Sequence, residues 1–437
     1  MMEQKRLIWI LIYALVILYP TNAADFVLDI YGNADMNEFL DEDDIQYIKS
    51  IIEGTNEETT LADANYDGEV DEEDIEQVQA ILDGRETRIT YMDILGEAET
   101  LNKPIKRLVN MGYNGVEMTR ILGAEDLLVA YGADRSAHKT YLPELSNLPS
   151  VSPDEGAQAE NADFEKIIML QPDALQTNIE RGSSTTAGRA QKDIFKKNLP
   201  DVPLISLNMR ELDVLVKNVR TYGYLIDHEK EAEEFIKWYT KYYDLFESRT
   251  EGIPEEERPM AFFEYASEPY NCYASGSNLG QVLVLAGGKN IIDGAVGPDD
   301  PQYKGMIAAD PEFIVKVNPK YIFEAVASWG DGGYETDDLS KMIASRDHVL
   351  NRSELANVDA VKNNQVYCLD YFLLIGAGNN IIGTAYMAKL LHPDLFEDID
   401  PVAIHQEYVD RFCRIDFNVE DRGAFLYPPY GSWVVEA

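Results

Sequence analysis

The sequence of 437 residues is poor in the side chains that most catalytic and metal centres use. Its three cysteines, Cys272, Cys368 and Cys413, are too few for a disulfide scaffold, and its five histidines include no pair at metal-ligand spacing. It has no nucleophile elbow, and the Gly-Ser-Ser-Thr-Thr run at 182–186 lacks the Gly-Lys-Ser/Thr ending of a phosphate-binding loop. These absences argue against an enzyme, and we expect a protein without catalytic activity.

Basic residues are also scarce. The chain has 37 Lys and Arg against 78 Asp and Glu, a formal net charge of −41. Residues 25–99 hold 24 acidic and three basic residues, so about half of the imbalance lies there. A surface of this charge repels phosphate backbones and anionic headgroups, which argues against nucleic acid and anionic lipid as partners.

Long hydrophobic runs are absent, because no segment stays apolar over the ~20 residues that a membrane-spanning helix needs. The uncharged run at 7–19 is shorter, follows Lys5 and Arg6, and leads to Ala23-Ala24-Asp25. This order is typical of an export signal. We predict a signal peptide at 1–24 and a mature protein that is extracellular, at the cell surface or in a periplasm-like space. Retention of the run as an anchor is the alternative.

What the sequence does contain is an acidic loop of twelve positions that occurs twice. Oxygen-bearing side chains at positions 1, 3, 5, 9 and 12 suit a cation that takes about six to eight oxygen ligands, as Ca²⁺ does. The second copy fits better, because Gly68 stands at position 6, where the first copy has Glu38. We predict two Ca²⁺ sites, with ligands Asn33, Asp35, Asn37, Asp41 and Asp44 in the first copy and Asp63, Asn65, Asp67, Glu69, Asp71 and Asp74 in the second.

Each loop is followed by a short apolar helix pattern, at 45–52 and 75–82. Loop-then-helix repeats with Asp at position 12 resemble the dockerin family over about residues 26–84. The resemblance implies a small all-α module at 25–86 that folds with calcium and, in that family, docks onto a cohesin domain. The positions that would contact a cohesin read Glu42-Asp43 and Glu72-Glu73, which leaves such a partner open.

The rest of the chain alternates short apolar strand and helix patterns. After a polar stretch at 87–102, which we interpret as a linker or a covering strand, this alternation predicts a parallel α/β lobe at 103–210. Apolar residues then recur with helical period over 211–250, with a break indicated by Gly223 and Asp227. A second alternation follows at 251–437. The predicted fold class is α/β, with two lobes joined by a long helix and preceded by the small module.

Four segments, at 104–132, 163–175, 310–322 and 355–367, resemble motifs of one family in their order along the chain. This family comprises the substrate-binding proteins of ABC importers for iron–siderophore, haem and cobalamin, which are built on one backbone helix. The resemblance covers about residues 103–412 and implies a class III periplasmic-binding-protein-like fold. It also implies capture of an iron or cobalt chelate and delivery to a membrane permease. The alternative is a dockerin-anchored scaffold or interaction protein of the cell surface.

Two glutamates match family positions that face the permease. Glu165 and Glu312 stand near the starts of two related predicted helices, one in each lobe. The resemblance implies that each pairs with arginines of the permease, and two carboxylates at a fixed separation could recognise a two-fold partner. The alternative is that both are ordinary acids of a first helical turn, which the helix dipole favours.

Aromatic residues follow the predicted strands at the edge where a ligand binds in such sheets. This set, with a few cations, suits a flat or bulky chelate that stacks on rings, with Arg181 or Arg135 pairing an anionic group. His138 or a tyrosine could ligate a metal directly, although a loop histidine without a metal is the alternative. The predicted ligand-binding residues are Tyr113, Asn114, His138, Arg181, Tyr265, Trp329 and Tyr371.

Overall fold

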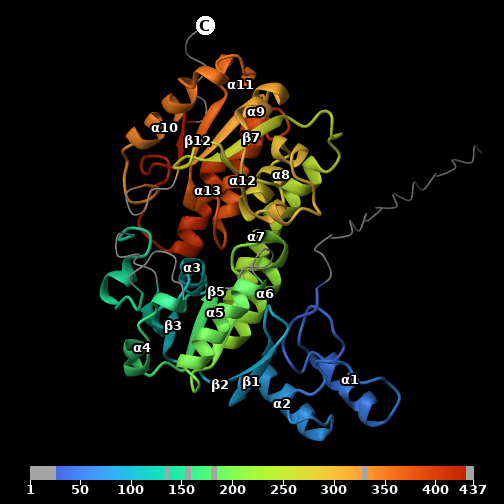
Figure 1. The fold of residues 1–437 in the computed structure, drawn as a ribbon. Coiled ribbons are helices and arrows are strands. Elements are labelled where there is room, and N and C mark those ends of the chain that lie inside the picture. Colours follow the sequence, from blue (N-terminus) through green and yellow to red (C-terminus); the bar gives the residue numbers. More distant parts are fainter. Residues whose placement is uncertain (1–25, 133–137, 153–158, 179–184, 327–331, 430–437) are drawn as a thin grey trace, which may run out of the picture.

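The computed structural model describes residues 26–132, 138–152, 159–178, 185–326 and 332–429. Two α/β lobes lie one above the other, and a small helical module lies beside the lower lobe (Figure 1). The predicted signal peptide at 1–24 falls outside the described residues. Within the described ranges, no helix is long and apolar enough to cross a membrane.

The N-terminal module contains two helices of the same length, α1 (Glu42–Ile52) and α2 (Glu72–Leu82). Each begins with a capping box, in which the side chain of the N-cap aspartate accepts a backbone N–H from the first turn. The side chain of a second aspartate, three residues later, accepts the backbone N–H of the N-cap residue. Ile45 and Ile48 of α1 and Val78 and Ile81 of α2 are buried. The repeated sequence therefore folds as a repeated structure.

The module is fixed to the lower lobe by a buried arginine, Arg220. Its Nη1 donates to the backbone carbonyl of Glu38 (3.2 Å), and its guanidinium lies 4.5 Å from the ring centre of Phe39. Its Nε also pairs with Glu233 at 2.5 Å. A second ion pair joins Lys217 to Asp29 at 2.5 Å. The first acidic loop is thus part of an interface inside the chain.

Residues 87–102 form an antiparallel hairpin of β1 (Arg88–Met92) and β2 (Ala98–Asn102), so a covering strand describes this segment better than a linker does. The buried hydroxyl of Tyr91 donates to the carbonyl of Leu204 (3.1 Å) and accepts from the N–H of Ser206 (2.8 Å). The buried Lys192 pairs with Asp93 at 2.6 Å. The hairpin joins the module to the lower lobe.

The lower lobe, which we call the N-lobe, is a four-stranded parallel sheet in the order β4-β3-β5-β6. Its strands are largely buried, as expected for a sheet covered on both faces. Its elements are β3 (Leu108–Asn110), α3 (Tyr113–Ile121), β4 (Leu128–Tyr131), α4 (Phe164–Leu170), β5 (Ala174–Asn178), α5 (Thr185–Asn198) and β6 (Leu204–Leu207).

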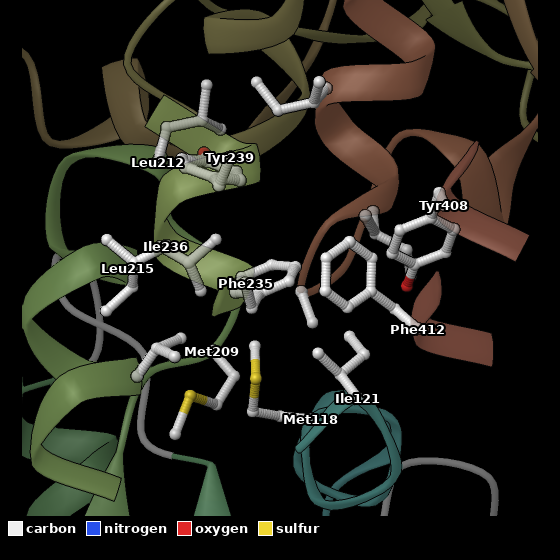
Figure 2. Close-up of a cluster of buried hydrophobic side chains, with 14 of the residues drawn as sticks. Met118, Ile121, Met209, Leu212, Leu215, Phe235, Ile236, Tyr239, Tyr408 and Phe412 are labelled. Atoms are coloured by element: carbon white, nitrogen blue, oxygen red, sulfur yellow. The ribbon is translucent and has the colours of Figure 1, made fainter. Parts of the chain in front are cut away.

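The predicted helix at 211–250 is two helices, α6 (Leu212–Ile226) and α7 (Glu229–Thr250). Asp227 ends α6 in the left-handed conformation (φ 60°), and the chain turns back there. Figure 2 shows Leu215 of α6 near Ile236 of α7, as an antiparallel pair requires. Only α7 continues into the upper lobe, where Phe246 packs against Phe396 (centroids 5.7 Å). Its 22 residues span about 33 Å.

The upper lobe, or C-lobe, has a sheet in the order β10-β8-β7-β11-β12-β13, with β9 beside β7. The central strands β7, β11 and β12 are parallel, whereas β8 pairs antiparallel with both β7 and β10, and β13 pairs antiparallel with β12. This sheet is therefore mixed and not purely parallel. Among the described residues, the two lobes share no strand. The elements are β7 (Met260–Tyr265), β8 (Asn271–Tyr273), α8 (Asn278–Leu285), β9 (Lys289–Asn290), β10 (Met306–Ala308), α9 (Pro311–Val317), β11 (Tyr321–Val326), α10 (Ser340–Leu350), α11 (Asp359–Lys362), β12 (Val366–Asp370), α12 (Asn379–Leu391), α13 (Pro401–Tyr408) and β13 (Leu426–Tyr427).

Candidate functional site

Three rings from both lobes meet where the lobes face each other. Tyr113 opens α3 of the N-lobe, and Phe372 follows β12 of the C-lobe in the 3-10 helix Tyr371–Leu373. Their ring centroids lie 5.1 Å apart. His138 completes the triangle, 5.7 Å from Tyr113 and 5.1 Å from Phe372. Sequence reasoning predicted Tyr113 and His138 from separate loops, and the fold brings them together.

The aromatic contact continues into the C-lobe. Tyr371 lies 5.7 Å from Phe372 and 5.7 Å from Tyr265, between ring centroids. Tyr265 and Tyr371 are half-buried, so part of each ring is accessible. Four of the seven predicted ligand residues therefore belong to one connected row of rings. We call Tyr113, His138, Tyr265, Tyr371 and Phe372 the aromatic row.

The other three predicted ligand residues have different positions. Asn114 is buried at the lobe contact, where its Nδ2 donates to the carbonyl of Ile375 at 3.4 Å. It therefore helps to join the lobes. Arg181 and Trp329 lie outside the described residues, as does Arg135.

A buried carboxyl group, Glu117, lies one helical turn beyond Tyr113 and Asn114. Its Oε1 accepts hydrogen bonds from the hydroxyl of Tyr141, from Nδ2 of Asn379 (2.5 Å) and from the hydroxyl of Tyr408 (3.3 Å). Burial raises the pKa of Glu117 to about 7, while these hydrogen bonds act in the opposite direction. Sequence reasoning missed Glu117, although its spacing from Tyr113 and Asn114 places the three on one helix face.

Further contacts close the lobes against each other around Glu117. Nε of Arg120 donates to the carbonyl of Cys413 at 2.8 Å, which ties α3 to the π-helical turn Val409–Cys413 of the C-lobe. The rings of Tyr141 and Tyr334 stack at 4.5 Å. Glu335 accepts from the N–H of Tyr141 at 2.9 Å. The lobes therefore meet at a second place besides α7.

An apolar cluster lies beside this second contact (Figure 2). Met118 and Ile121 of α3 face Phe412 of the C-lobe, with Phe235 of α7 between the helices. The rings of Phe235 and Phe412 lie 5.3 Å apart between centroids. Because close-packed side chains resist displacement, this cluster holds the lobes in one relative position.

A cavity of about 500 Å³ lies away from the aromatic row. It lies between the start of α6, the second half of α7 and α8, where Asp213, Tyr243 and Gln281 line it. Members of the aromatic row are not among its lining residues. It is therefore separate from the aromatic row.

The predicted docking glutamates occupy equivalent positions. Glu165 is the second residue of α4 and Glu312 the second residue of α9, and both side chains are exposed. One stands on each lobe, as the sequence suggested. Their contact with a permease stays a prediction.

The first acidic loop is closed by hydrogen bonds among its own predicted ligands. Asp44 is buried and accepts from the N–H groups of Asp35 (3.2 Å) and Asp41 (2.9 Å). Burial raises the pKa of Asp44 to about 7. The buried side chain of Asn33 donates to the carbonyl of Asn37 at 2.7 Å.

The second loop has the same plan with more exposed side chains. Asp63 accepts from the N–H groups of Asp67 (3.0 Å) and Gly68 (2.9 Å), and Asn65 donates to Asp67 at 3.0 Å. Asp71 caps α2, Glu69 is exposed, and burial raises the pKa of Asp74. In the described part of the chain, no three His, Cys, Asp or Glu side chains lie so that they could hold a metal ion. The Ca²⁺ ligands therefore stay a prediction.

Two α/β lobes on one connecting helix, with rings from both lobes at their contact, have the architecture of a two-lobe binding protein. The sequence profile described as "Periplasmic binding protein" matches residues 109–371, and the chain belongs to this family. It is a family of binding proteins without enzymatic activity. Membership implies a solute as cargo and the permease of an ABC transporter as partner.

Solved structures support the fold. The molybdate-binding protein MolA of Haemophilus influenzae is 17% identical with a TM-score of 0.58, covering 75% of this chain and 98% of its own. The TroA-like FepB of Veillonella parvula is 20% identical with a TM-score of 0.59, and the match covers 77% of this chain and 98% of FepB. CeuE of Helicobacter pylori, solved with nickel and histidine, is 19% identical with a TM-score of 0.58, and the match covers 76% of this chain and 98% of CeuE. Comparison with curated proteins gives no match.

Proposed function

We propose that this solute-binding protein captures an iron or cobalt chelate of the siderophore, haem or cobalamin type and delivers it to the permease. The aromatic row carries this proposal, because rings of both lobes meet there and its C-lobe members Tyr265 and Tyr371 are half-buried. Rings bind flat or bulky apolar groups by stacking and area burial. His138, which lies within the row, could approach the metal of such a chelate.

The relatives show that one fold serves different cargo. MolA is described with molybdate and CeuE with nickel and histidine, at identities that support the fold alone. The cargo must therefore follow from this chain's own side chains. Rings make up the aromatic row, whereas a small oxyanion needs cations and hydrogen-bond donors. This difference favours a chelate with an organic surface.

Titration tests this assignment. Haem, cyanocobalamin and a ferric hydroxamate siderophore are the probes, molybdate is the comparison, and quenching of intrinsic fluorescence is the signal. We expect one of the three chelates to bind with one-to-one stoichiometry and without turnover. Tyr113→Ala should weaken that binding at least tenfold, which corresponds to ~1.4 kcal/mol, while Tyr47→Ala on α1 should not. Tight binding of molybdate alone would reject the chelate.

Delivery to the permease rests on Glu165 and Glu312. Their carboxylates are exposed and stand on a rigid pair of lobes, so they could pair with arginines of a two-fold permease. We expect Glu165→Arg combined with Glu312→Arg to abolish uptake by intact cells and to leave cargo affinity unchanged. Unchanged uptake in this double variant would reject the role of both glutamates.

Calcium is the proposed cofactor of the two acidic loops. The fit of these loops to Ca²⁺ rests on their donor atoms, because each loop contains carboxylate and amide oxygens. Burial also raises the pKa of Asp44 and Asp74. A bound cation would neutralise these carboxylates and stabilise the loops. We expect a chelator to lower the circular-dichroism signal of α1 and α2 while the lobes keep their own signal. A spectrum that does not respond to chelator or to added Ca²⁺ would contradict this.

A second candidate function is attachment to a cell-surface scaffold through the dockerin-like module. One observation favours it: Glu42, Asp43, Glu72 and Glu73 are all exposed at the starts of α1 and α2. A cohesin-type domain is the partner to test, in the presence and absence of Ca²⁺.

Export, on which both functions depend, is tested by N-terminal sequencing of the mature protein, which should begin near Asp25.

A further inference from the structure

The two lobes carry the same short structural unit. Helices α4 and α9 are each seven residues long and begin after an aspartate, Asp163 or Asp310, whose side chain accepts a backbone N–H from the first turn. Each ends at a residue in the left-handed conformation, Gln171 (φ 48°) or Asn318 (φ 56°). The sequence motif that relates the two lobes is thus a repeat in the structure.

The unit has the same place in both sheets. Helix α4 leads into β5, which pairs with β3 in parallel, and α9 leads into β11, which pairs with β7 in parallel. In each helix one isoleucine, Ile167 or Ile314, is fully buried. This buried side chain fixes the rotation of the helix on its lobe. The residues that face outward are therefore equivalent in the two lobes.

Each unit exposes an apolar side chain beside its glutamate. Ile168 is 55% exposed and Val315 is 39% exposed, and each stands three residues after Glu165 or Glu312. Residues three apart are neighbours on a helix surface, so the carboxylate and the apolar side chain share one face. Met169, at 83%, extends the apolar surface on the N-lobe.

An exposed aliphatic side chain alone needs no explanation. Here, however, the exposure recurs at the same position of the repeated unit, next to the same carboxylate, on both lobes. Packing within each lobe does not require an apolar residue at this exposed position, because Ile167 and Ile314 already fill the buried position of each helix. A partner that contacts both lobes in the same way would require the exposed apolar residue on each.

We propose that Ile168 and Val315 are the apolar halves of two equivalent docking contacts, which receive a two-fold pair of membrane subunits. This inference rests on the proposed delivery to a permease and deepens it. The partner needs a cation beside an apolar hollow at each of two positions. The ion pair orients the encounter and is screened by salt, whereas the apolar contact resists salt and slows release.

Uptake of the co-purified cargo by cells that carry only the variant protein tests the proposal. We expect Ile168→Ser combined with Val315→Ser to reduce uptake at least tenfold with cargo affinity unchanged. The matched control is Ile343→Ser with Leu395→Ser, since these residues are exposed to 37% and 39% on other parts of the C-lobe. The control should keep wild-type uptake. Unimpaired uptake in the first pair, or equal loss in both pairs, would overturn the inference.

Photo-crosslinking in native membranes gives an independent readout. A photoreactive side chain at position 168 and one at position 315 should each label the same integral-membrane subunit, and one at position 343 should not. Labelling of different proteins from the two positions, or equal labelling from position 343, would overturn the inference.

The outcomes separate this inference from the proposed function. If uptake does not depend on the protein at all, delivery itself fails and the inference fails with it. If the Glu165 and Glu312 double variant loses uptake while the apolar pair does not, only the inference fails. If the apolar pair alone matters, the inference stands and the role of the glutamates is rejected.

Discussion

At the scale of single residues, Glu117 links the contact between the lobes to pH. Its carboxyl group is buried at that contact and accepts hydrogen bonds from Tyr141 of the N-lobe and from Asn379 and Tyr408 of the C-lobe. Burial raises its pKa from about 4.5 to about 7. Burial at this contact therefore favours the protonated form of the carboxyl group relative to the unfolded chain.

The pH dependence of stability follows from this shift. Because the pKa of Glu117 is higher in the folded than in the unfolded protein, its protonation stabilises the fold. This stability is fully present below the pKa of the unfolded state, about 4.5, and is lost as the pH rises through the pKa of the folded state, about 7. We expect the unfolding free energy of the wild type, relative to Glu117→Gln, to fall by ~2 to 3 kcal/mol between about pH 5 and 8. Urea unfolding of both proteins across this range measures it. Parallel pH profiles would contradict the account.

The candidate site shows what sequence reasoning can find at this scale. Tyr113, His138, Tyr265 and Tyr371 were predicted because each follows a strand, and parallel strands bring such residues to one edge. Glu117 was not predicted, because it lies inside a helix whose apolar pattern indicates only packing. Its partners Asn379 and Tyr408 follow more than 250 residues later, and no local pattern points to them.

At the scale of elements, the β1–β2 hairpin joins the module to the N-lobe. The polar residues of 87–102 show no clear period, so the sequence was compatible with either a linker or a covering strand. The decisive contacts are distant in sequence, because Tyr91 meets Leu204 and Ser206 of β6. The long helical pattern was easier to interpret, and Asp227 marked its break because the left-handed conformation ends a helix there.

The hydroxyl of Tyr91 gives a test of this junction. Tyr91→Phe leaves a buried carbonyl and a buried N–H of β6 without their partner, so we expect a loss of about 1 to 3 kcal/mol in unfolding free energy. Tyr66→Phe is the control, since Tyr66 is 48% exposed. Denaturant unfolding of the wild type, Tyr91→Phe and Tyr66→Phe measures the loss in unfolding free energy. Equal stability of Tyr91→Phe and the control would mean that the hairpin does not hold the module.

At the scale of the whole molecule, the lobes are held together twice. Helix α7 connects them, and α3 contacts the C-lobe through Arg120, Tyr141 and the apolar cluster of Figure 2. Such an arrangement favours cargo binding with little movement of the lobes. We expect the radius of gyration from small-angle scattering to change by less than about 1 Å on cargo binding. A larger compaction would show that the lobes open and close.

The central claim is that the aromatic row receives an organic metal chelate. Native mass spectrometry of the protein purified without added ligand, together with metal analysis, tests it most directly. The account predicts one bound species per chain that contains iron or cobalt within an organic ligand, and that is lost in Tyr113→Ala. A bound oxyanion, a bare metal ion or a cargo without metal would contradict it.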